Sequence, residues 1–461
     1  MRTRESVTEI IKAYDVRGIV GEQITSDFIY DVGAAFGNLM RAEQETTVAI
    51  GHDMRPSSPE LAQAFADGVR SQGLDVVMVG LSSTDQLYFV SGVRDIPGAM
   101  FTASHNPAEY NGIKMCRSGA RPVGQETGLA AIIDMLVAGV PLFDGEPGGQ
   151  VAEDSLAAYG EFLRSLVPLS DIRPLKVAVD AANGMAGHTV PEVFRGLPLE
   201  IIPLYFELDG TFPNHEANPL DPKNLVDLQK FTVEVGADIG LAFDGDADRC
   251  FVVDETGNPV SPSAICGLIA QRYLAQQPGA TIIHNLITSK AVPEIIGESG
   301  GQAVRTRVGH SFIKAKMAEH NALFGGEHSA HYYFQDFFNA DSGILAAMHV
   351  LAALGQVDQP LSELMHQYDR YHASGEVNFR LDSADQQLER TAAVLEAFAD
   401  RTDSVDKLDG VTVDLKDAPT WFNLRASNTE PLLRLNVEAK TPQAVAALVA
   451  EISEIIRPAS H

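Results

Sequence analysis

The segment DGDADR at residues 244–249 places three carboxylates at alternate positions, directly after a short apolar run. In an extended strand, Asp244, Asp246 and Asp248 would lie about 6.6 Å apart along one face. That spacing is too wide for one ion whose oxygen distances are roughly 2.0–2.6 Å. Gly245 allows the chain to curl, so we expect the three carboxylates to converge. Because packed carboxylates repel one another and oxygen ligands suit hard ions, the segment predicts a Mg²⁺ site.

Two other interpretations of this segment compete with a Mg²⁺ site. Glu255 stands at the twelfth position counted from Asp244, as in a calcium-binding EF-hand loop. That loop needs Gly at its sixth position, where this chain has Arg249, and the following CFVV is typical of a strand. A solvated acidic turn is the remaining alternative. Arg249 argues against it, because a fixed cation there suits a phosphate that shares the metal.

TASHNP at residues 102–107 sets Ser104 at the end of a predicted strand, next to His105 and shortly before Lys114. A serine hydroxyl is a poor nucleophile without a base or a metal. Acyl transfer through serine and histidine and carriage of a phosphoryl group are both open, but the chain lacks a GxSxG elbow at this serine. A phosphoserine facing a metal site makes electrostatic sense. The alternative is a polar turn in which Asn106-Pro107 ends the strand.

RASNTEP at residues 425–431 lies between two predicted strands and combines a forked donor with hydroxyls. Arg425, Ser427 and Thr429, with the N–H groups of the turn, form a candidate phosphate cradle. The segment has no GKS/T and so is not a nucleotide P-loop. An ordinary hairpin turn would explain the Ser-Asn pair, but not the arginine and threonine together.

Three further segments carry polar side chains that are not persuasive in isolation. In GGEHSAHYYF at 325–334, Glu327 and Ser329 alternate, so an extended segment would point both the same way, as ligands for sugar hydroxyls. His328 and His331 are ambiguous, since single histidines are often structural. The remaining candidates are His310 in RTRVGHSFIK, and Tyr14 and Arg17 in KAYDVRG.

Short apolar runs alternate with longer helical patterns through most of the chain, which predicts mostly parallel sheets covered by helices. The predicted strands come in three rounds, at 46–51, 75–80 and 97–105, then 175–184, 199–207 and 237–243, then 280–289, 302–309 and 322–327. From about Gly375 onward, strands and two amphipathic helices predict a smaller α+β domain, with Thr441 capping the last helix. The predicted seams are 143–150, 254–262 and the stretch from His366 to Gly375.

The composition limits the classes of function. The chain has 461 residues and a formal charge of −28, with 45% apolar residues. One hydrophobic core rarely grows past roughly 250–300 residues, so we expect several domains. The acidic balance argues against nucleic-acid and membrane partners. Three scattered cysteines predict neither disulfides nor zinc, and the polar N-terminal segment and lack of any run of about 18 apolar residues predict a cytoplasmic protein.

Taken together and in this order, these loops resemble those of the α-D-phosphohexomutase superfamily, in particular its bacterial phosphomannomutase/phosphoglucomutase branch. The resemblance implies an α/β fold with three related mixed α/β domains plus a smaller C-terminal α+β domain around a central cleft. The implied domains are 1–150 with a phosphoserine loop, 151–256 with a metal loop, 257–370 with a sugar loop and 371–461 with a phosphate loop.

The resemblance also implies a role for each residue that matches a family motif. Ser104 matches the phosphorylated serine and would complete the Mg²⁺ coordination by Asp244, Asp246 and Asp248. The residues expected beside the transferring phosphoryl group are His105, Lys114 and Arg249. The residues expected to hold the sugar and its other phosphate are Glu327 and Ser329, then Arg425, Ser427, Asn428 and Thr429. The auxiliary contacts are Tyr14, Arg17, Lys290, His310 and His331.

The implied reaction interconverts hexose 6-phosphate and hexose 1-phosphate, of mannose and also glucose, through a sugar 1,6-bisphosphate that turns over in the site. Lys114 and His310 are the two candidates for the general base. Asn428 favours the mannose/glucose branch over phosphoglucosamine mutases, while His328 and Ala330 depart from the commoner sugar loop and leave the sugar preference open. A metal-dependent sugar phosphatase and a non-catalytic sugar-phosphate sensor are the competing classes. The sequence predicts no oligomeric state.

Overall fold

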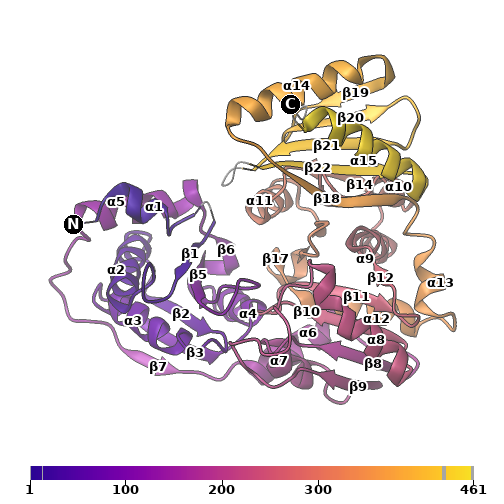
Figure 1. The fold of residues 1–461 in the computed structure, drawn as a ribbon. Coiled ribbons are helices and arrows are strands. Elements are labelled where there is room, and N and C mark those ends of the chain that lie inside the picture. Colours follow the sequence, from indigo (N-terminus) through magenta and orange to yellow (C-terminus); the bar gives the residue numbers. More distant parts are fainter. Residues whose placement is uncertain (1, 13, 428–431, 458–461) are drawn as a thin grey trace. The chain divides into compact units, whose positions relative to one another are not determined.

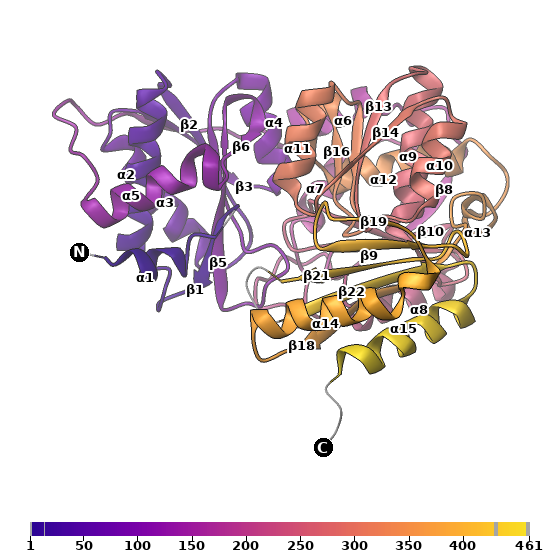
Figure 2. The same cartoon turned by 90° about the horizontal axis from the view of Figure 1, so that it is seen from above.

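The computed structural model describes residues 2–12, 14–427 and 432–457, with the backbone only for His310. The described chain divides into two compact units. Unit 1 comprises residues 1–260, 317–324 and 329–364, and unit 2 comprises residues 261–316, 325–328 and 365–461. Both are drawn in Figures 1 and 2 and are described separately below.

Unit 1 begins with a seven-stranded mixed sheet in the order β1-β5-β4-β2-β3-β7, with β6 paired to β5. Its strands are β1 (Val16–Ile19), β2 (Thr47–His52), β3 (Asp75–Leu81), β4 (Gly98–Phe101), β5 (Tyr110–Arg117), β6 (Arg121–Pro122) and β7 (Gln150–Ala152). Strand β2 runs parallel to β3 and β4, whereas β5 is antiparallel to β4 and β1. The connection between β4 and β5 therefore lies at the edge of the sheet where β2 and β4 have their carboxyl ends.

The helices of this part are α1 (Arg4–Thr8), α2 (Ser26–Ala42), α3 (Ser58–Arg70), α4 (Thr84–Arg94) and α5 (Ala130–Ala138). Helices α2 and α3 lie side by side (Figure 1). In α3 the buried Leu61, Phe65 and Val69 recur every four residues, which gives one apolar stripe. These side chains join a continuous core with Val48, Ile50 and other strand residues. Burial of that stripe holds the helices on the sheet.

The second sheet of unit 1 has the order β12-β11-β10-β8-β9. Its strands are β8 (Leu175–Asp180), β9 (Leu199–Leu204), β10 (Ile239–Phe243), β11 (Cys250–Asp254) and β12 (Pro259–Val260). Strands β8, β9 and β10 are parallel, and β11 turns back antiparallel to β10. All five residues of β10 are buried, as expected for a central strand. The predicted metal segment forms the tight connection between β10 and β11.

The remaining helices and strands lie in unit 1 or contain residues of both units. The helices are α6 (Leu156–Leu166), α7 (Ala186–Val193), α8 (Val226–Val235), α11 (His310–His320), α12 (Gly343–Gly355) and α13 (Leu361–Met365). The strands are β15 (Phe324–Gly326), β16 (Tyr332–Phe334) and β17 (Ala340–Asp341). Strands β16 and β17 are antiparallel, and α12 follows β17 directly.

Unit 2 contains a parallel strand pair and a complete antiparallel sheet in the order β18-β22-β21-β20-β19. Its strands are β13 (Thr281–Asn285), β14 (Gln302–Thr306), β18 (His372–Arg380), β19 (Thr402–Asp406), β20 (Val411–Leu415), β21 (Trp421–Ala426) and β22 (Leu432–Ala439). Its helices are α9 (Pro262–Gln276), α10 (Ala291–Glu298), α14 (Ala384–Ala397) and α15 (Pro442–Ile456). Helices α14 and α15 cover the same face of the antiparallel sheet (Figure 2), where Val394 and Leu448 join its core. Thr441 caps α15 as predicted, because its side chain accepts the N–H of Ala444 at 3.2 Å.

The predicted strands all correspond to strands of the structure, but the sheets are less parallel than predicted. Strand β5, which is antiparallel to β4, was not predicted as a strand, and neither was β19. Both strands mix charged or polar residues with apolar ones, so the apolar-run criterion misses them. The smaller C-terminal α+β part is confirmed by the all-antiparallel sheet and its two helices.

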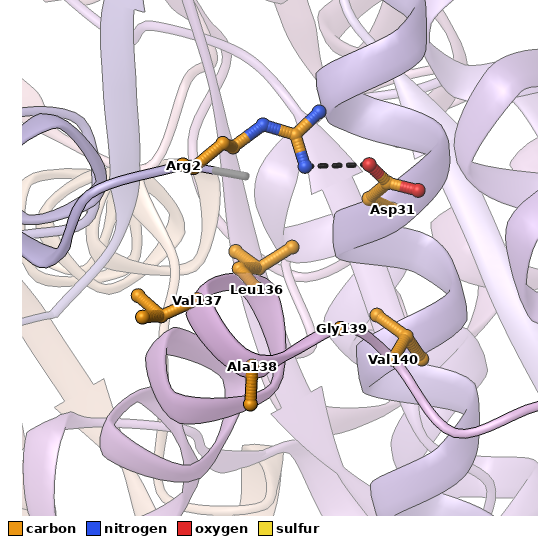
Figure 3. Close-up of a pocket in the computed structure, with 7 residues that line it drawn as sticks. All are labelled: Arg2, Asp31, Leu136, Val137, Ala138, Gly139 and Val140. Carbon is orange, nitrogen blue, oxygen red and sulfur yellow. Dashed lines mark hydrogen bonds and ion pairs between the residues drawn. The ribbon is translucent and has the colours of Figure 1, made fainter.

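Two further observations concern membrane-spanning helices and a pocket of unit 1. Within the residues that the structure describes, no helix is long and apolar enough to cross a membrane. A pocket in unit 1 lies between the start of the chain, α2 and the end of α5, and is lined by Arg2, Asp31 and residues 136–140 (Figure 3). Arg2 and Asp31 form an ion pair across it at 2.5 Å. None of the predicted site residues lines this pocket.

Candidate functional site

Ser104 lies in the connection between β4 and β5 and is held in an unusual backbone conformation. Its φ is +48°, in the left-handed region that residues with a Cβ seldom adopt. The backbone N–H of Ser104 donates to Thr102 Oγ1 at 2.9 Å, and its side chain is buried. The hydroxyl donates to Asp244 Oδ2 at 2.8 Å and accepts from Arg249 at 3.2 Å. The loop thus directs one serine hydroxyl at the predicted metal segment.

The three aspartates of the β10–β11 connection are fully buried and converge, as predicted. Each offers a carboxylate oxygen, and these atoms lie within 4.8 Å of one another. The chain curls there, with Gly245 in the turn and Ala247 in the left-handed conformation at φ +61°. Gly245 is also required by the neighbouring loop. A Cβ at Gly245 would stand 2.4 Å from the carbonyl oxygen of Ser104, so the two loops touch through backbone.

Two cations and a hydroxyl contact the aspartates. The Lys114 ammonium, on β5, donates to Asp246 Oδ2 at 2.6 Å and also pairs with Asp248. Arg249 Nε donates to Asp244 Oδ2 at 2.9 Å. Thr84, the first residue of α4, donates from Oγ1 to Asp246 Oδ2 at 2.5 Å. Three carboxylates face two basic side chains, so the cluster keeps a net negative charge when all five groups are ionised.

Burial and charge set the protonation of this cluster. Burial raises the pKa of Asp244 to about 8, against the opposing charge of Arg249. Burial and Asp248 act in the same direction on Asp246, but Lys114 outweighs them and lowers the pKa of Asp246. Burial would lower the pKa of Lys114, yet the two carboxylates raise it. The Arg249 charge, together with burial, holds the pKa of His105 well below its usual value, so His105 is neutral.

The donor atoms of this cluster fit a hard divalent cation. Asp246 Oδ1 and Asp248 Oδ1 are buried and have no hydrogen-bond partner within the described part of the chain. An unsatisfied buried carboxylate oxygen is costly unless an ion completes it. All the available donors are oxygens, which matches Mg²⁺ better than zinc or copper. The trio can therefore bind a metal ion, with the Ser104 hydroxyl beside it.

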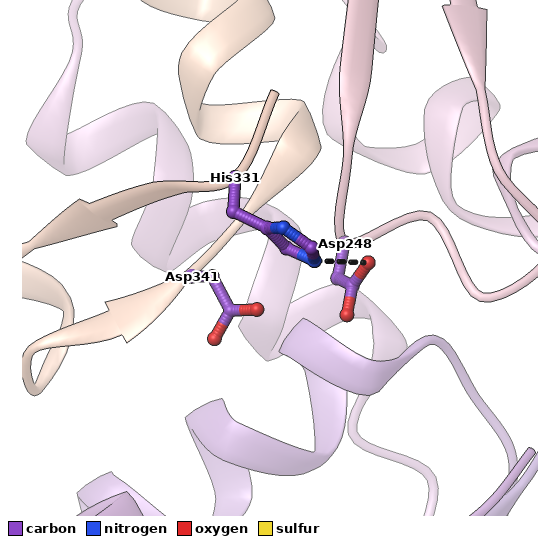
Figure 4. Close-up of side chains that lie close together, drawn as sticks. All are labelled: Asp248, His331 and Asp341. Atoms are coloured by element: carbon purple, nitrogen blue, oxygen red, sulfur yellow. Dashed lines mark ion pairs between the residues drawn. The ribbon is translucent and has the colours of Figure 1, made fainter. Parts of the chain in front are cut away.

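His331 also reaches the aspartates of unit 1. Its Nε2 lies 3.7 Å from Asp248 Oδ1, and its backbone forms a bridge with Arg249. Asp341, at the end of β17, completes a second group of possible ligands with Asp248 and His331 (Figure 4). The ring nitrogen Nδ1 of His331 lies 3.2 Å from the Ser329 hydroxyl. Ser329 and His331 are thus brought together near the metal loop.

Arg17 belongs to the serine loop as well, from its position on β1. Its guanidinium donates to the carbonyl of Ala103 at 3.1 Å and to Asn106 Oδ1 at 2.6 Å. Tyr14 stands two residues before Val16, the first residue of β1. His105 Nδ1 lies 3.2 Å from Ser104 Oγ and also contacts the Arg249 guanidinium. The structure thus gathers seven residues predicted for the phosphoryl-transfer site in unit 1: Arg17, Ser104, His105, Lys114, Asp244, Asp246 and Asp248, with Arg249 and His331 beside them.

Glu327 lies in unit 2 and binds backbone and amide donors there. Its Oε1 accepts from Gly309 N at 3.2 Å and from Asn285 Nδ2 at 3.3 Å. The expectation of an extended segment from Glu327 to Ser329 was wrong, because residues 328–330 form a turn with Ala330 at φ +63°. A left-handed alanine has no signature in the sequence pattern.

Lys290 is the N-cap residue of α10. Its ammonium pairs with Asp414, and its backbone N–H donates to Glu438 Oε1 at 2.9 Å. His310 is the first residue of α11. The predicted residues Asn428 and Thr429 lie outside the described residues, as does the side chain of His310.

Arg425 stands at the end of β21, and Arg434 of β22 is its cross-strand partner. Like charges directly opposite one another destabilise a sheet unless counter-charges or an anion compensate. Glu376 lies 3.5 Å from Arg425 and 3.6 Å from Arg434, and the Nε atom of each arginine has no hydrogen-bond partner among the described residues. Ser427 accepts weakly from Arg434 at 3.5 Å. Arg434, which the sequence analysis missed, therefore adds a second cation beside the predicted phosphate loop.

The sequence analysis also missed Arg55, Thr84 and Asp341. Each contacts or faces a site residue that is far away in sequence. Arg55 and Thr84 follow the carboxyl ends of β2 and β3, the edge where side chains of neighbouring parallel strands meet. Their position just after two predicted strands was the sequence signal that could have identified Arg55 and Thr84.

The chain is similar to known proteins over nearly its whole length. Four family models match the chain, described as phosphoglucomutase/phosphomannomutase alpha/beta/alpha domains I, II and III, at residues 8–137, 157–257 and 261–371, and the C-terminal domain at 376–455. A Xanthomonas campestris protein named "Phosphohexose mutases" is 39% identical over 450 residues, covering 97% of this chain and 98% of its own. An Escherichia coli phosphomannomutase is 38% identical over 441 residues, covering 93% and 94%. The crystal structure of a phosphoglucomutase/phosphomannomutase family protein from Burkholderia thailandensis superposes with a TM-score of 0.90 at 32% identity, covering 100% of this chain and 99% of its own.

Proposed function

Because the chain belongs to the phosphoglucomutase/phosphomannomutase family and is a hexose-phosphate mutase, we propose that Ser104 carries the phosphoryl group that it transfers. The observation that supports this most is the distance of 2.8 Å from the Ser104 hydroxyl to Asp244, within a converged trio of aspartates. A mutase needs a group that accepts one phosphate and returns another. A buried serine beside a cation site meets that need.

In the proposed reaction, the phosphorus–oxygen bond to Ser104 Oγ breaks as a bond forms to the free hydroxyl of a hexose monophosphate. The sugar 1,6-bisphosphate then turns over, and its other phosphate returns to Ser104. Asp244, Asp246 and Asp248 would hold Mg²⁺, which supplies stabilisation of the charge on the transferring group. Arg249 and His331 are placed to hold the phosphoryl oxygens, and exclusion of water from Ser104 would protect the phosphoserine from hydrolysis.

The hydroxyl of the sugar loses a proton when it attacks. Lys114 and His310 are the predicted acceptors of that proton. Lys114 is held as an ammonium by Asp246 and Asp248, which supports a role in balancing charge. We therefore propose His310 as the base and Lys114 as the cation that keeps the aspartates in place.

We propose mannose phosphates as the main substrates and glucose phosphates as further ones. The names of the E. coli and B. thailandensis relatives support both sugars. Glu327 and Ser329 would hold sugar hydroxyls, with Tyr14 as an auxiliary contact. Arg425, Ser427, Asn428 and Thr429 would hold the phosphate that does not react, with Arg434 opposite Arg425 in the sheet and Lys290 as an auxiliary contact. The domain limits stated above and a cytoplasmic location remain predictions.

The test compares kcat/KM for mannose 1-phosphate, glucose 1-phosphate and glucosamine 1-phosphate, with inorganic phosphate measured in a single turnover. We expect mannose and glucose phosphates to be converted well, glucosamine 1-phosphate poorly, and no inorganic phosphate to appear. A preference for glucosamine 1-phosphate would identify a phosphoglucosamine mutase instead. Stoichiometric release of inorganic phosphate would identify a sugar phosphatase.

A further inference from the structure

Arg55 is one of the largest fully buried side chains of unit 1, with 1% of its surface exposed. It follows β2 in the segment HDMRPSS and was assigned no role by the sequence analysis. Removing a guanidinium from water is costly, so a buried arginine needs partners for its donors. The partners of Arg55 are unusual, because most of them are backbone carbonyls of one loop.

That loop is the β4–β5 connection that carries Ser104. The guanidinium donates four hydrogen bonds to its carbonyls. Nη1 donates to Pro107 at 2.7 Å and to Tyr110 at 2.9 Å. Nη2 donates to Ser104 at 3.0 Å and to Asn106 at 2.7 Å. A forked guanidinium has five donors in one plane, whereas an ammonium has three. Only the fork can bind four carbonyls of one loop at once.

The guanidinium is itself held in place from both sides. Its Nε lies 3.3 Å from Asp53 Oδ2, and Asp53 accepts from the Ser58 hydroxyl at 2.6 Å and from the backbone N–H of Arg55 at 3.0 Å. The ring of Phe212 lies over the guanidinium, 5.1 Å from its central carbon. A Cβ on Gly210 would come within 2.6 Å of the Arg55 backbone, so this segment packs closely as well. Arg55 is thus a fixed point to which the loop is attached.

The attachment acts on the residue that needs it. Ser104 has a left-handed backbone, which persists only when surrounding contacts impose it. The Ser104 carbonyl accepts a hydrogen bond from Arg55 Nη2 and lies against Gly245 of the metal loop. Because the peptide is planar and trans, fixing this carbonyl also directs the His105 N–H to the opposite side. The fixed peptide holds the Ser104 backbone at the place from which its hydroxyl reaches Asp244 at 2.8 Å.

We propose that Arg55 is a positioning residue for phosphoryl transfer, holding the serine loop so that Ser104 Oγ faces the aspartate trio. This inference rests on the proposed function of Ser104. It requires no contact between Arg55 and the sugar or the metal, since the guanidinium donors are directed at the loop carbonyls and Asp53. Loss of the fork should misplace the nucleophile while leaving the residues proposed to hold the sugar unchanged. Misplacement of a reacting group by about 1 Å can cost on the order of a hundredfold in rate.

The test uses Arg55→Lys, which keeps the charge and removes the fork. We expect kcat and the rate of Ser104 phosphorylation by a sugar 1,6-bisphosphate to fall by about ten- to a hundredfold. The KM for the hexose phosphate should stay within about twofold of the parent. Arg164→Lys is the matched control, because Arg164 also donates to two carbonyls, those of Glu192 at 2.7 Å and Val193 at 3.1 Å, but has no predicted role in the site. That control should keep the parent kcat.

Asp53→Asn is the second variant, in case Arg55→Lys does not fold. It keeps the size of the side chain and removes the charge that orients Arg55, so it should lower kcat by less while leaving KM unchanged. Parent kcat in either folded variant, or an equal loss in Arg164→Lys, would overturn the proposal. If the parent itself never becomes phosphorylated on Ser104, the proposed function fails instead, and the two failures are distinguishable.

Discussion

Asp85 is a buried carboxylate that joins three segments of unit 1. It accepts hydrogen bonds from Tyr159 OH at 2.6 Å and from Ser342 Oγ at 2.6 Å, and it also contacts the Ser83 hydroxyl. Its neighbour Thr84 binds Asp246, so this helix start supports the metal loop. Burial raises the pKa of Asp85 to about 6, despite the three hydroxyl donors. The carboxyl is therefore easier to bury when protonated.

The sign of the resulting pH dependence follows from the raised pKa. Between the unfolded pKa of 3.8 and about 6, the folded state binds more protons, so this group loses stabilisation as the pH rises. Asp85→Asn resembles the protonated form and should gain on the parent by on the order of 1 kcal/mol in unfolding free energy between pH 5 and pH 7.5. Urea unfolding of both proteins across this range measures it. A difference that does not change with pH would contradict the assignment.

Arg425 allows a test of the predicted phosphate loop in unit 2. Arg425→Ala removes a charge-assisted contact to the phosphate that does not react, which should cost roughly 1.5–3 kcal/mol, or about ten- to more than a hundredfold in kcat/KM. Because remote binding energy also promotes the chemical step, kcat should fall with affinity. Steady-state kinetics with mannose 1-phosphate measures both constants.

Arg401→Ala is the control, since Arg401 lies in the same unit and forms an exposed pair with Glu451 at 2.8 Å. Phosphorylation of Ser104 by the bisphosphate should persist in Arg425→Ala, because unit 1 is unchanged. Normal substrate binding and turnover in that variant would mean that RASNTEP is an ordinary turn between β21 and β22.

Two connections, β4–β5 and β10–β11, meet through backbone, and Gly245 is the contact point. In Gly245→Ala the new Cβ would stand 2.4 Å from the Ser104 carbonyl oxygen, so the loops must separate. We expect kcat to fall at least about tenfold and Mg²⁺ affinity to weaken, because serine and aspartates no longer share one geometry. Kinetics over a Mg²⁺ titration checks both effects. Gly297→Ala in α10 is the control, since a Cβ there meets nothing within 4 Å; parent-like constants for both variants would refute the contact.

The strands and the main loops could be predicted from the sequence because each is encoded locally. Apolar runs such as 239–243 identify buried strands, and DGDADR carries its chemistry within six residues. Contacts across long sequence separations could not be predicted, as for Thr84 with Asp246 or Arg55 with the Ser104 loop. The left-handed conformations of Ser104 and Ala247 also escaped prediction, because tertiary contacts impose them on residues whose own preference is otherwise.

The chain as a whole carries a charge of −28, and the aspartate trio concentrates part of it in a buried place. With Asp244, Asp246 and Asp248 against Lys114 and Arg249, the cluster sums to −3 + 2 = −1 when fully ionised. Adding a doubly charged phosphoserine would make it −3, and a divalent cation restores −1. A bound ion therefore stabilises the folded state and makes phosphorylation of Ser104 less costly.

Mg²⁺ should accordingly raise the thermal unfolding midpoint of the parent. At a Mg²⁺ concentration a hundred times the dissociation constant, the unfolding free energy should rise by about 2.7 kcal/mol. A chelator should remove this gain and abolish turnover reversibly. Asp246→Asn should lose most of the Mg²⁺-dependent gain, and its metal-free stability should fall below that of the parent, because the charge that pairs with Lys114 is gone. Thermal scans with Mg²⁺ or chelator check this, and full activity in excess chelator would refute the metal site.

Transfer of a labelled phosphoryl group tests the central role of Ser104 most directly. Enzyme radiolabelled by incubation with a sugar 1,6-bisphosphate is mixed with unlabelled mannose 1-phosphate, and the label is followed in protein, sugar phosphates and inorganic phosphate. We predict that the parent carries the label on Ser104 and passes it to the sugar within one turnover, without inorganic phosphate, while Ser104→Ala takes up none and is inactive. Isomerisation by Ser104→Ala at the parent rate, or label that leaves the parent only as inorganic phosphate, would contradict the phosphoserine mechanism.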